Sequence, residues 1–432
     1  MAEFIEKKWV EITSRNPVSG KDFPQGLKNF KFSVGQGYGF IPSQSYFKVD
    51  LTIKQFDAAG DSEDVSNITY ADGVCGNLFN NIYFNMGGQT VSSITTGLPQ
   101  CDILKNRLTK SKAWNDTVGK TQGFDPLYQT RNADMNTDVT SITVTDPVFN
   151  TTNRASKSFM WQPAIGIFDV SQPLGAAEYD IQLNPSQDYR TAALDGGNVG
   201  VSIPLNAINP GYSGATGSLN TVDLIVENIK FYACMVRVNL PSSGVETLHL
   251  MEMSVHTGNV RAGNANNIDE EFSVPSSTRA MTLFLQDQQA GKSTSVPPSK
   301  YHIIGRNNEA ISIQDYQIEY AGLTKPTVRY KSQYDANTLG IQQRYLNSAL
   351  ESGQYFNPAG FESLQEYMER GPFLHESFIK SADNLATRAH VVASYSANNT
   401  NDARIFLVAH HSRTVQITRQ NGLVVNIVSL NT

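Results

Sequence analysis

The chain is poor in cysteine and has no long apolar run. Its 432 residues contain three cysteines, Cys75, Cys101 and Cys234, with no paired spacing. This usage predicts no disulfide framework and is typical of a reducing compartment, so we expect each thiol to be a small buried residue. No segment approaches the ~20 apolar residues of a membrane helix, and the first residues lack the apolar stretch of a signal peptide. We expect a soluble protein that spans no membrane and is not secreted by the usual route.

Positive charge is scarce as well. The chain has 34 Lys and Arg against 40 Asp and Glu, a formal net charge of −6, and no basic tail. Binding to a phosphate backbone needs clustered Lys and Arg, so this balance argues against sequence-specific nucleic-acid binding.

The motifs of common enzymes are incomplete. Gly119-Lys120-Thr121 and Gly291-Lys292-Ser293 lack the glycine five positions earlier that a phosphate-binding loop requires, because Trp114 and Gln286 stand there. Gly211-Tyr212-Ser213-Gly214-Ala215 lacks the last glycine of a nucleophile elbow. No nucleophile, base and orienting group emerge as a set, so the sequence predicts no enzyme and no catalytic residue.

The histidines show no metal-ligand spacing with one another or with cysteine. Two of them are adjacent in the chain, and in a strand they would point to opposite sides. We interpret all seven as polar strand residues: His249, His256, His302, His375, His390, His410 and His411. The sequence therefore predicts no metal ligand and no cofactor-binding residue.

What the chain does contain is strand and turn patterning. In the stretch from Leu78 to Ile94, Ile82, Phe84 and Met86 fall on one face of an extended strand. Gly87-Gly88 can adopt the positive φ angles of a two-residue turn, so the stretch predicts a β-hairpin.

A short helix is predicted directly after this hairpin. Pro99 suits a helix start, and Ile103, Leu104 and Leu108 lie on one side of the segment from Pro99 to Leu108.

The hairpin and the helix both recur further along the chain. Ile82-Tyr83-Phe84 followed by Gly87 has a counterpart in Ile318-Glu319-Tyr320 followed by Gly322, at an offset of 236 residues (318 − 82). The helix has a counterpart in Asp335 to Leu350, also at 236 (335 − 99), with three residues on one face: Ile341, Tyr345 and Leu346.

A third landmark lies upstream of each hairpin. Phe40-Ile41-Pro42-Ser43 is matched by Phe272-Ser273-Val274-Pro275-Ser276 at an offset of 233 (275 − 42). Three landmarks in the same order at nearly the same offset predict two tandem copies of one β-rich domain. No long helices separate the strands, which favours antiparallel sandwiches over a parallel α/β sheet.

The predicted organisation is an N-terminal arm over residues 1–31, a first domain over 32–240 and a second over 241–432. The apolar face switches by one residue near Asn228, which indicates a β-bulge. Two long polar excursions, Lys112 to Lys157 and Asp195 to Asn220, are expected to be functional surface loops. Near the end, Asn421-Gly422 between alternating strands predicts a closing hairpin.

Several stretches, in order along most of the chain, carry a resemblance to a known family. They are Phe40 to Phe47, Gly76 to Asn81, Tyr320 to Pro326, and Ala409 to Arg413 with Asn421-Gly422. They look like the double jelly-roll major capsid proteins of small dsDNA viruses, nearest to those of Polinton-like viruses, adintoviruses and virophages. The wider lineage includes adenovirus hexon and tailless bacteriophage capsids.

The resemblance implies an all-β fold of two tandem eight-stranded antiparallel jelly rolls with a few short helices. It also implies a homotrimer of pseudo-sixfold outline that tiles an icosahedral virion shell, assembled inside the host cell. Partners would be neighbouring capsomers, a penton protein and minor capsid proteins, and genome packaging would belong to a separate ATPase. The two polar excursions would face outward or contact other subunits, and the arm would lie on the inner face or clasp the next capsomer.

Two other functions remain open at this point. One is a coat protein with a single jelly roll and a projection domain, in which the second half would be the spike. The other is a carbohydrate-binding β-sandwich of the fibre or lectin type, for which the first excursion offers four aromatic side chains: Trp114, Phe124, Tyr128 and Phe149.

Overall fold

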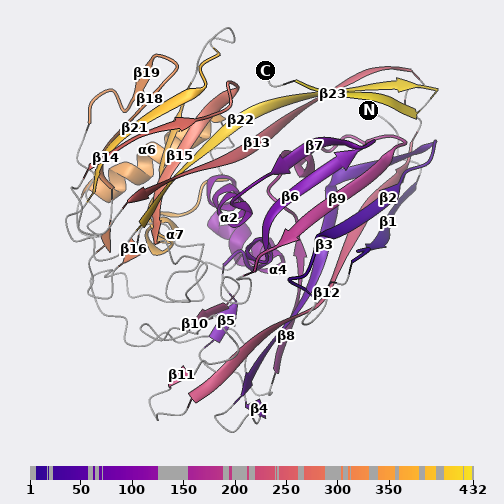
Figure 1. The fold of residues 1–432 in the computed structure, drawn as a ribbon, viewed down its shortest axis with the longest axis horizontal. Helices are drawn as coiled ribbons and strands as arrows, with labels where there is room; N and C mark the ends of the chain where they lie inside the picture. The colour runs from indigo at the N-terminus through magenta and orange to yellow at the C-terminus, as the bar shows by residue number, and fades with distance from the viewer. Residues whose placement is uncertain are drawn as a thin grey trace.

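The computed structural model of the chain describes residues 6–16, 18, 23–56, 62–63, 68–70, 72–124, 154–187, 194–196, 212–213, 219–238, 240, 243–260, 267–287, 303–304, 310–311, 313–329, 339–355, 360–378, 385–395, 403–421 and 423–430. Two β-sandwiches, one from each half of the chain, lie side by side (Figure 1). Long strands of the second half extend over the end of the first at the top of the view.

The first sandwich consists of two antiparallel sheets. In one, β12 pairs with β1 and β3, and β8 pairs with the other edge of β3. The other has the order β2-β9-β6-β7. The eight strands are β1 (Glu6–Thr13), β2 (Lys28–Ser33), β3 (Tyr38–Phe56), β6 (Phe79–Met86), β7 (Gln89–Ile94), β8 (Arg154–Trp161), β9 (Glu178–Pro185) and β12 (Leu219–Arg237).

The second sandwich has the same construction. One sheet has the order β13-β22-β15-β20, with β23 added to β22, and the other has the order β14-β21-β18-β19. The strands are β13 (Gly244–Val260), β14 (Asn267–Ser273), β15 (Thr278–Asp287), β18 (Ile313–Tyr320), β19 (Leu323–Lys325), β20 (Leu374–Ser377), β21 (Arg388–Tyr395), β22 (Ala403–Gln420) and β23 (Leu423–Leu430).

Strand order is therefore identical in the two halves. Order β1-β12-β3-β8 corresponds to β13-β22-β15-β20, and order β2-β9-β6-β7 corresponds to β14-β21-β18-β19. All pairs are antiparallel. The predicted fold of two tandem eight-stranded jelly rolls is confirmed.

Short elements connect these strands. Four are helices or helical turns of the first half, α1 (Val74–Asn77), α2 (Leu98–Thr109), α3 (Lys112–Trp114) and α4 (Lys120–Gln122), with a π-helix over Asn115–Gly119 and a 3-10 helix, η4, over Gly166–Asp169. The second half has α6 (Leu339–Tyr355) and α7 (Leu364–Glu369). The remaining strands are β4 (Ser62–Glu63), β5 (Ile68–Tyr70), β10 (Leu194–Gly196), β11 (Tyr212–Ser213), β16 (Ile303–Ile304) and β17 (Ala310–Ile311).

The repeated hairpins follow the predicted alternation but not the predicted offset. Ile82, Phe84 and Met86 are fully buried, as expected. The turns Gly87-Gly88 (φ 56° and 80°) and Ala321-Gly322 (φ 57° and 77°) are equivalent, which gives an offset of 234 (321 − 87) rather than 236. The predicted match of Phe40 with Phe272 is wrong, because one lies in β3 and the other in β14, the counterpart of β2.

Strand β22 is buried on both faces over residues 405–409. In β22, Ile405, Leu407 and Ala409 pack in the core of the second sandwich, whereas Phe406 and Val408 belong to the core of the first. Phe406 stacks on Phe284 with ring centroids 5.1 Å apart. One hydrophobic core therefore continues from the first jelly roll into the junction between the two.

Two predicted irregularities of the chain are present. The register of β12 against β3 shifts between Val226 and Asn228, which confirms the bulge. The closing hairpin β22-β23 forms, with Asn421 at φ 52°. It lies on the first jelly roll, where the Val424 N–H donates to the Ala176 carbonyl at 3.3 Å.

Two stretches differ from the prediction. Residues 6–13 of the expected arm form β1, an outer strand paired along its whole length with β12, and Lys28 already begins β2. The start of the expected loop at Lys112 is helical up to Gln122, because tertiary hydrogen bonds hold a segment of weak helix formers. The rest of that excursion up to residue 153 lies outside the described residues.

Candidate functional site

The junction between the jelly rolls is formed by the helix that follows each repeated hairpin. Gly97 (φ 69°) precedes α2 and Pro99 lies in its first turn, and the predicted face of Ile103, Leu104 and Leu108 is fully buried. Arg107 lies in the same helix and is also fully buried. The helix thus fixes a buried cation between the two halves.

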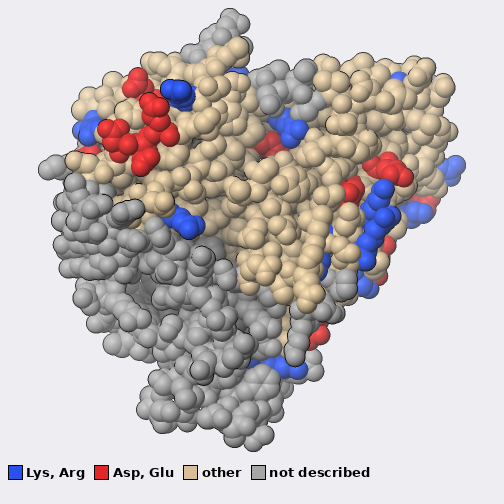
Figure 2. All heavy atoms as spheres, in the orientation of Figure 1, with Lys and Arg blue, Asp and Glu red and all other residues tan. Residues whose placement is uncertain are grey.

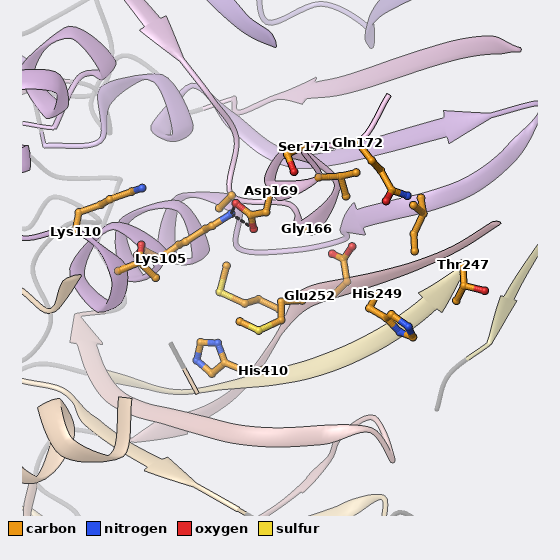
Figure 3. Close-up of a pocket in the computed structure, with 16 residues that line it drawn as sticks. Lys105, Lys110, Gly166, Asp169, Ser171, Gln172, Thr247, His249, Glu252 and His410 are labelled. Carbon is orange, nitrogen blue, oxygen red and sulfur yellow. Dashed lines mark hydrogen bonds and ion pairs between the residues drawn. The ribbon is translucent and has the colours of Figure 1, made fainter. Parts of the chain in front are cut away.

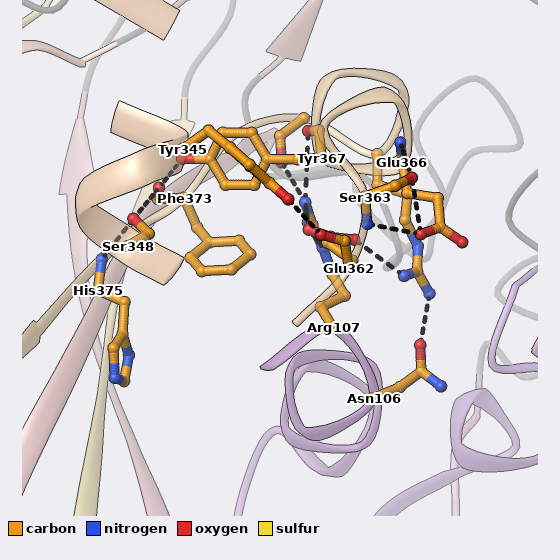
Figure 4. Close-up of polar contacts among 12 residues, drawn as sticks. Asn106, Arg107, Tyr345, Ser348, Glu362, Ser363, Glu366, Tyr367, Phe373 and His375 are labelled. Carbon is orange, nitrogen blue, oxygen red and sulfur yellow. Dashed lines mark hydrogen bonds and ion pairs between the residues drawn. The ribbon is translucent and has the colours of Figure 1, made fainter. Parts of the chain in front are cut away.

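Arg107 binds Glu362 of the second half (Figure 4). Its Nε donates to Glu362 Oε1 at 2.8 Å, and its Nη2 donates to the Gly371 carbonyl at 2.9 Å. Its guanidinium carbon lies 4.7 Å from the centroid of the Phe373 ring. Neither charged side chain is exposed to solvent, so this pair is a fixed, desolvated link between the jelly rolls.

Arg370 makes the reciprocal link from the second half to the first. Its Nε donates to Asp72 Oδ2 at 2.8 Å, and its Nη2 donates to Asn106 Oδ1 at 3.1 Å. Its Nη1 lies 3.1 Å from Glu362 Oε2. Glu362 is thereby shared by two arginines, one from each half.

Glu366 extends this network while it caps α7. Its Oε2 accepts hydrogen bonds from the Ser363 N–H at 2.9 Å and the Ser363 hydroxyl at 3.0 Å, in a capping box. Its Oε1 accepts from Asn115 Nδ2 at 3.1 Å. Asn115 Oδ1 accepts in turn from Asn106 Nδ2 at 3.0 Å, so the helical turn at Asn115 is tied to α2.

Burial and ion pairing oppose each other in this network. Burial raises the pKa of Glu362, and the guanidinium groups of Arg107 and Arg370 lower it. Burial disfavours the charge of Arg370, but Asp72 and Glu362 more than offset this and raise its pKa. Such pairs contribute little net stability when intact, but removing one partner is costly.

Helix α6 buries three polar side chains, and one of them reaches the first jelly roll. Arg344, Ser348 and Ser352, at i, i+4 and i+8, are buried, and Ser352 Oγ donates to the Leu108 carbonyl of α2 at 3.3 Å. The predicted apolar face is wrong for Leu346, which is 55% exposed, and holds for Tyr345, which packs on the core. The side chain of Ile341 is outside the described residues.

A cavity of about 800 Å³, the junction cavity, lies beside this network (Figure 3). It is lined by α2, by the segment from Ala164 to Gln172 that contains η4, by β13 and by β22. Its polar lining includes Lys105, Asp169, Glu252 and His410.

Two buried carboxyl groups near the cavity have strongly altered acidity. Burial raises the pKa of Glu252 to about 7, although Ser92 donates a hydrogen bond to it from β7. Burial raises the pKa of Asp102 to about 7 as well, against a hydrogen bond from Trp161 Nε1 at 3.0 Å. Both groups therefore change charge near neutral pH.

Two of the histidines, His375 and His410, are buried in the second jelly roll. Thr282 Oγ1 lies between His375 Nδ1 at 2.8 Å and His410 Nε2 at 2.9 Å, and burial lowers the pKa of His375 to about 3. His410 is buried whereas the adjacent His411 is partly exposed, as strand alternation predicts. Within the described residues, no three His, Cys, Asp or Glu side chains are placed to hold a metal ion. His302 lies outside that part of the chain.

The cysteines and the loop aromatics also pack in the interior. Cys75, Cys101 and Cys234 are free and buried, as predicted. Trp114 and Phe124 pack on the first core and on each other, with ring centroids 6.3 Å apart, so they are not the exposed platform that sugar binding needs. Tyr128 and Phe149 lie outside the described residues.

The junction residues were missed from the sequence for a physical reason. Arg107 and Glu362 are 255 positions apart, and nothing local marks either as buried. One local pattern was present, Ser363-Leu364-Gln365-Glu366, which has the form of a capping box. It predicts the start of α7 but not the second role of Glu366.

On the face shown in Figure 2, Lys and Arg are dispersed and do not form a large patch among the described residues. A cluster of acidic side chains lies over β14 and β18, and includes Asp269, Glu271 and Glu319 with side-chain exposures of 76%, 65% and 62%. No helix among the described residues is long and apolar enough to cross a bilayer.

No protein-family model matches the sequence, and no curated protein matches it significantly. Solved structures match the whole fold. A chain of the Sputnik virophage has a TM-score of 0.60 at 10% identity, over 100% of this chain and 89% of that one. The mavirus major capsid protein has a TM-score of 0.55 at 8% identity, over 98% of this chain and 90% of that one. The Faustovirus major capsid protein has a TM-score of 0.53 at 9% identity, over 96% of this chain and 90% of that one. At these identities the likeness shows the fold, so the resemblance is confirmed as a shared double jelly roll.

Proposed function

We propose that this chain is the major capsid protein of an icosahedral dsDNA virus and acts through shape and packing, without catalysis. The observation that carries the proposal is the repetition of one eight-strand order in two sandwiches set side by side. The matching chains of the Sputnik virophage, of the mavirus major capsid protein and of the Faustovirus major capsid protein share this fold over 89% to 90% of their length. Its place is the virion, assembled inside the host cell.

The unit of assembly in this proposal is a trimer. Three chains of two similar sandwiches give six similar lobes, which is the outline that tiles a hexagonal lattice. Two outer strands expose apolar side chains that suit subunit contacts: Trp9 and Val10 of β1 are 49% and 36% exposed, and Val425 of β23 is 53% exposed. Further partners are neighbouring capsomers, a penton protein and minor capsid proteins.

We place the division between the jelly rolls near residue 240. Strand β12 ends at Arg237 and β13 begins at Gly244, so the linker between them is short. The parts of the two polar excursions that lie outside the described residues, 125–153 and 197–211, stay candidates for the outer surface or for subunit contacts. Residues 1–5 of the predicted arm, also outside the described residues, stay candidates for contacts with the next capsomer.

Light scattering of the purified protein at micromolar concentration tests the assembly. We expect the mass of a trimer, and hexagonal particles by negative-stain microscopy. A stable monomer would overturn the trimer and count against the capsid proposal.

Of the two alternative functions, the structure excludes one and gives no support to the other among the described residues. A single jelly roll with a projection domain is excluded, because the second half is itself a jelly roll. A carbohydrate-binding protein keeps no supporting observation among the described residues, since Trp114 and Phe124 pack inward. Binding to a glycan array would restore it.

A further inference from the structure

Glu252 is a buried acceptor that the fold leaves incompletely satisfied. Its side chain lines the junction cavity, and the residue is 2% exposed. One carboxylate oxygen, Oε1, accepts from the Ser92 hydroxyl, and the backbone N–H of Gly166 also favours the charged carboxylate, whereas Oε2 has no hydrogen-bond partner among the described residues. A buried carboxylate oxygen without a donor is destabilising, and a charged donor satisfies it best.

The cations around the cavity already have partners. Lys105 Nζ lies 2.7 Å and 2.9 Å from the two carboxylate oxygens of Asp169. Lys110 Nζ lies 5.0 Å from the centroid of the Trp114 ring, and Arg413 Nη2 donates to the Thr90 carbonyl at 2.9 Å. In Figure 3, Lys105 bonds Asp169 on the far side of the cavity from His249, and Glu252 lies between them. Arg413 and Lys105 lower the pKa of Glu252 through space, but the hydrogen bonds described for these two cations go to other groups.

The cavity walls suit an aliphatic stem. Leu248, Met251 and Met253 of β13 line it together with Val170 of the facing segment. Methionine side chains are flexible and polarizable, so they adapt to ligands of different shape. A volume of about 800 Å³ is in the range of small-molecule sites.

The cavity also joins the two halves. Lys105 and Asp169 come from the first jelly roll, whereas Glu252 and His410 come from the second. Gly166 packs directly on β13, since a Cβ atom there would lie 2.5 Å from the Met251 carbonyl oxygen. A ligand in this position touches both jelly rolls and stabilises their mutual placement by its binding free energy.

We propose that the junction cavity binds an alkylammonium or alkylguanidinium group, with the cation at the Glu252 carboxylate and the methylene stem against Met251 and Met253. A small diamine and a lysine or arginine side chain of a bound peptide both present this chemistry. The inference does not depend on the capsid proposal, because it rests on the cavity within one chain.

Titration calorimetry on the full-length protein tests this, with agmatine, n-butylamine, n-butanol and N-acetyl-lysine amide as probes. We expect the three cationic probes to bind and raise the melting temperature, and n-butanol to do neither. Tighter binding of agmatine or butylamine indicates a free amine as the natural ligand, and tighter binding of N-acetyl-lysine amide indicates a peptide side chain.

Glu252→Gln should weaken binding of the cationic probes roughly tenfold or more, because a neutral amide replaces the carboxylate. Glu376→Gln is the matched control: Glu376 is also buried with a pKa raised by burial to about 7, but it accepts from Tyr316 and does not line the cavity. Met251→Gln, which leaves Glu252 in place, should weaken binding a few-fold through the stem. Equal affinity in the wild type and Glu252→Gln, or no binding to the wild type, would overturn the proposal.

Discussion

Arg107 and Glu362 show what a single buried charge does in this molecule. The two side chains come from different jelly rolls and neither is exposed, so each compensates the other's buried charge. Phe373 covers the guanidinium group, and Arg370 supplies a second cation to the same carboxylate. Loss of one member leaves the others desolvated and incompletely paired.

Arg107→Met should lower the free energy of unfolding by about 3 kcal/mol, because it leaves Glu362 buried with one cation in place of two. Urea denaturation followed by tryptophan fluorescence measures the change. Lys112→Met is the control, since Lys112 and Asp116 form a pair in which both side chains are more than 40% exposed, and its loss should cost less than about 1 kcal/mol. Equal losses in the two variants would contradict a structural role for the buried pair.

Glu252 should make stability depend on pH. Its pKa is raised from 4.5 to about 7 in the folded chain, so its contribution to stability is complete below pH 4.5 and is lost as the pH rises to about 7. Glu252→Gln removes this dependence. As the pH rises over that interval, the wild type should lose a few kcal/mol of unfolding free energy relative to the variant.

The pH dependence due to Glu252 is the difference in unfolding free energy between the wild type and Glu252→Gln at each pH, and not the change in the wild type alone. Buried histidines act in the opposite sense: burial lowers the pKa of His375 to about 3 and of His411 to about 4, so their contribution is lost as the pH falls toward those values. That contribution cancels in the difference. A difference independent of pH, from denaturation at pH 5 and pH 8, would refute the assignment.

At the scale of elements, the two repeated hairpins form the same turn conformation with different residues. Gly87-Gly88 and Ala321-Gly322 both place their first residue at positive φ, 56° and 57°. Glycine adopts this conformation freely, whereas alanine is strained there. The second hairpin therefore keeps a backbone strain that the first avoids.

Ala321→Gly should stabilise the chain by about 1 kcal/mol, and Gly87→Ala should destabilise it by about the same amount. The space around the Gly87 position does not decide the result, because a Cβ there would meet only Ile427 Cδ1 at an ordinary 3.6 Å. Thermal unfolding of both variants measures the two opposite shifts. Shifts of the same sign would show that contacts and not the backbone dominate.

Elements with local determinants could be predicted from the sequence, and elements held by distant partners could not. The hairpins, the bulge near Asn228 and α2 follow from alternation, glycine turns and one apolar face. The buried face of α6 carries Arg344 and two serines, which no apolar pattern marks. The ion pairs and the junction cavity join residues that are far apart in sequence, so no spacing rule could have found them.

At the scale of the whole molecule, the hydrophobic core of the first jelly roll includes residues of the second. Leu248, Phe284 and Val415 of the second half belong to the same cluster as the core of the first. We therefore expect one cooperative unfolding transition by differential scanning calorimetry of the full-length protein, because neither half keeps its buried surface without the other. Two well separated transitions would show that the junction contributes little.

The two-sided burial of β22 has a consequence for synthesis on the ribosome. The first half emerges with its junction face uncovered and stays so until β22, the last long strand but one, has been translated. During that interval each nascent polypeptide exposes an aggregation-prone apolar surface to the other nascent chains on the same polysome. We therefore expect folding yield in a cell to depend on how quickly translation reaches β22.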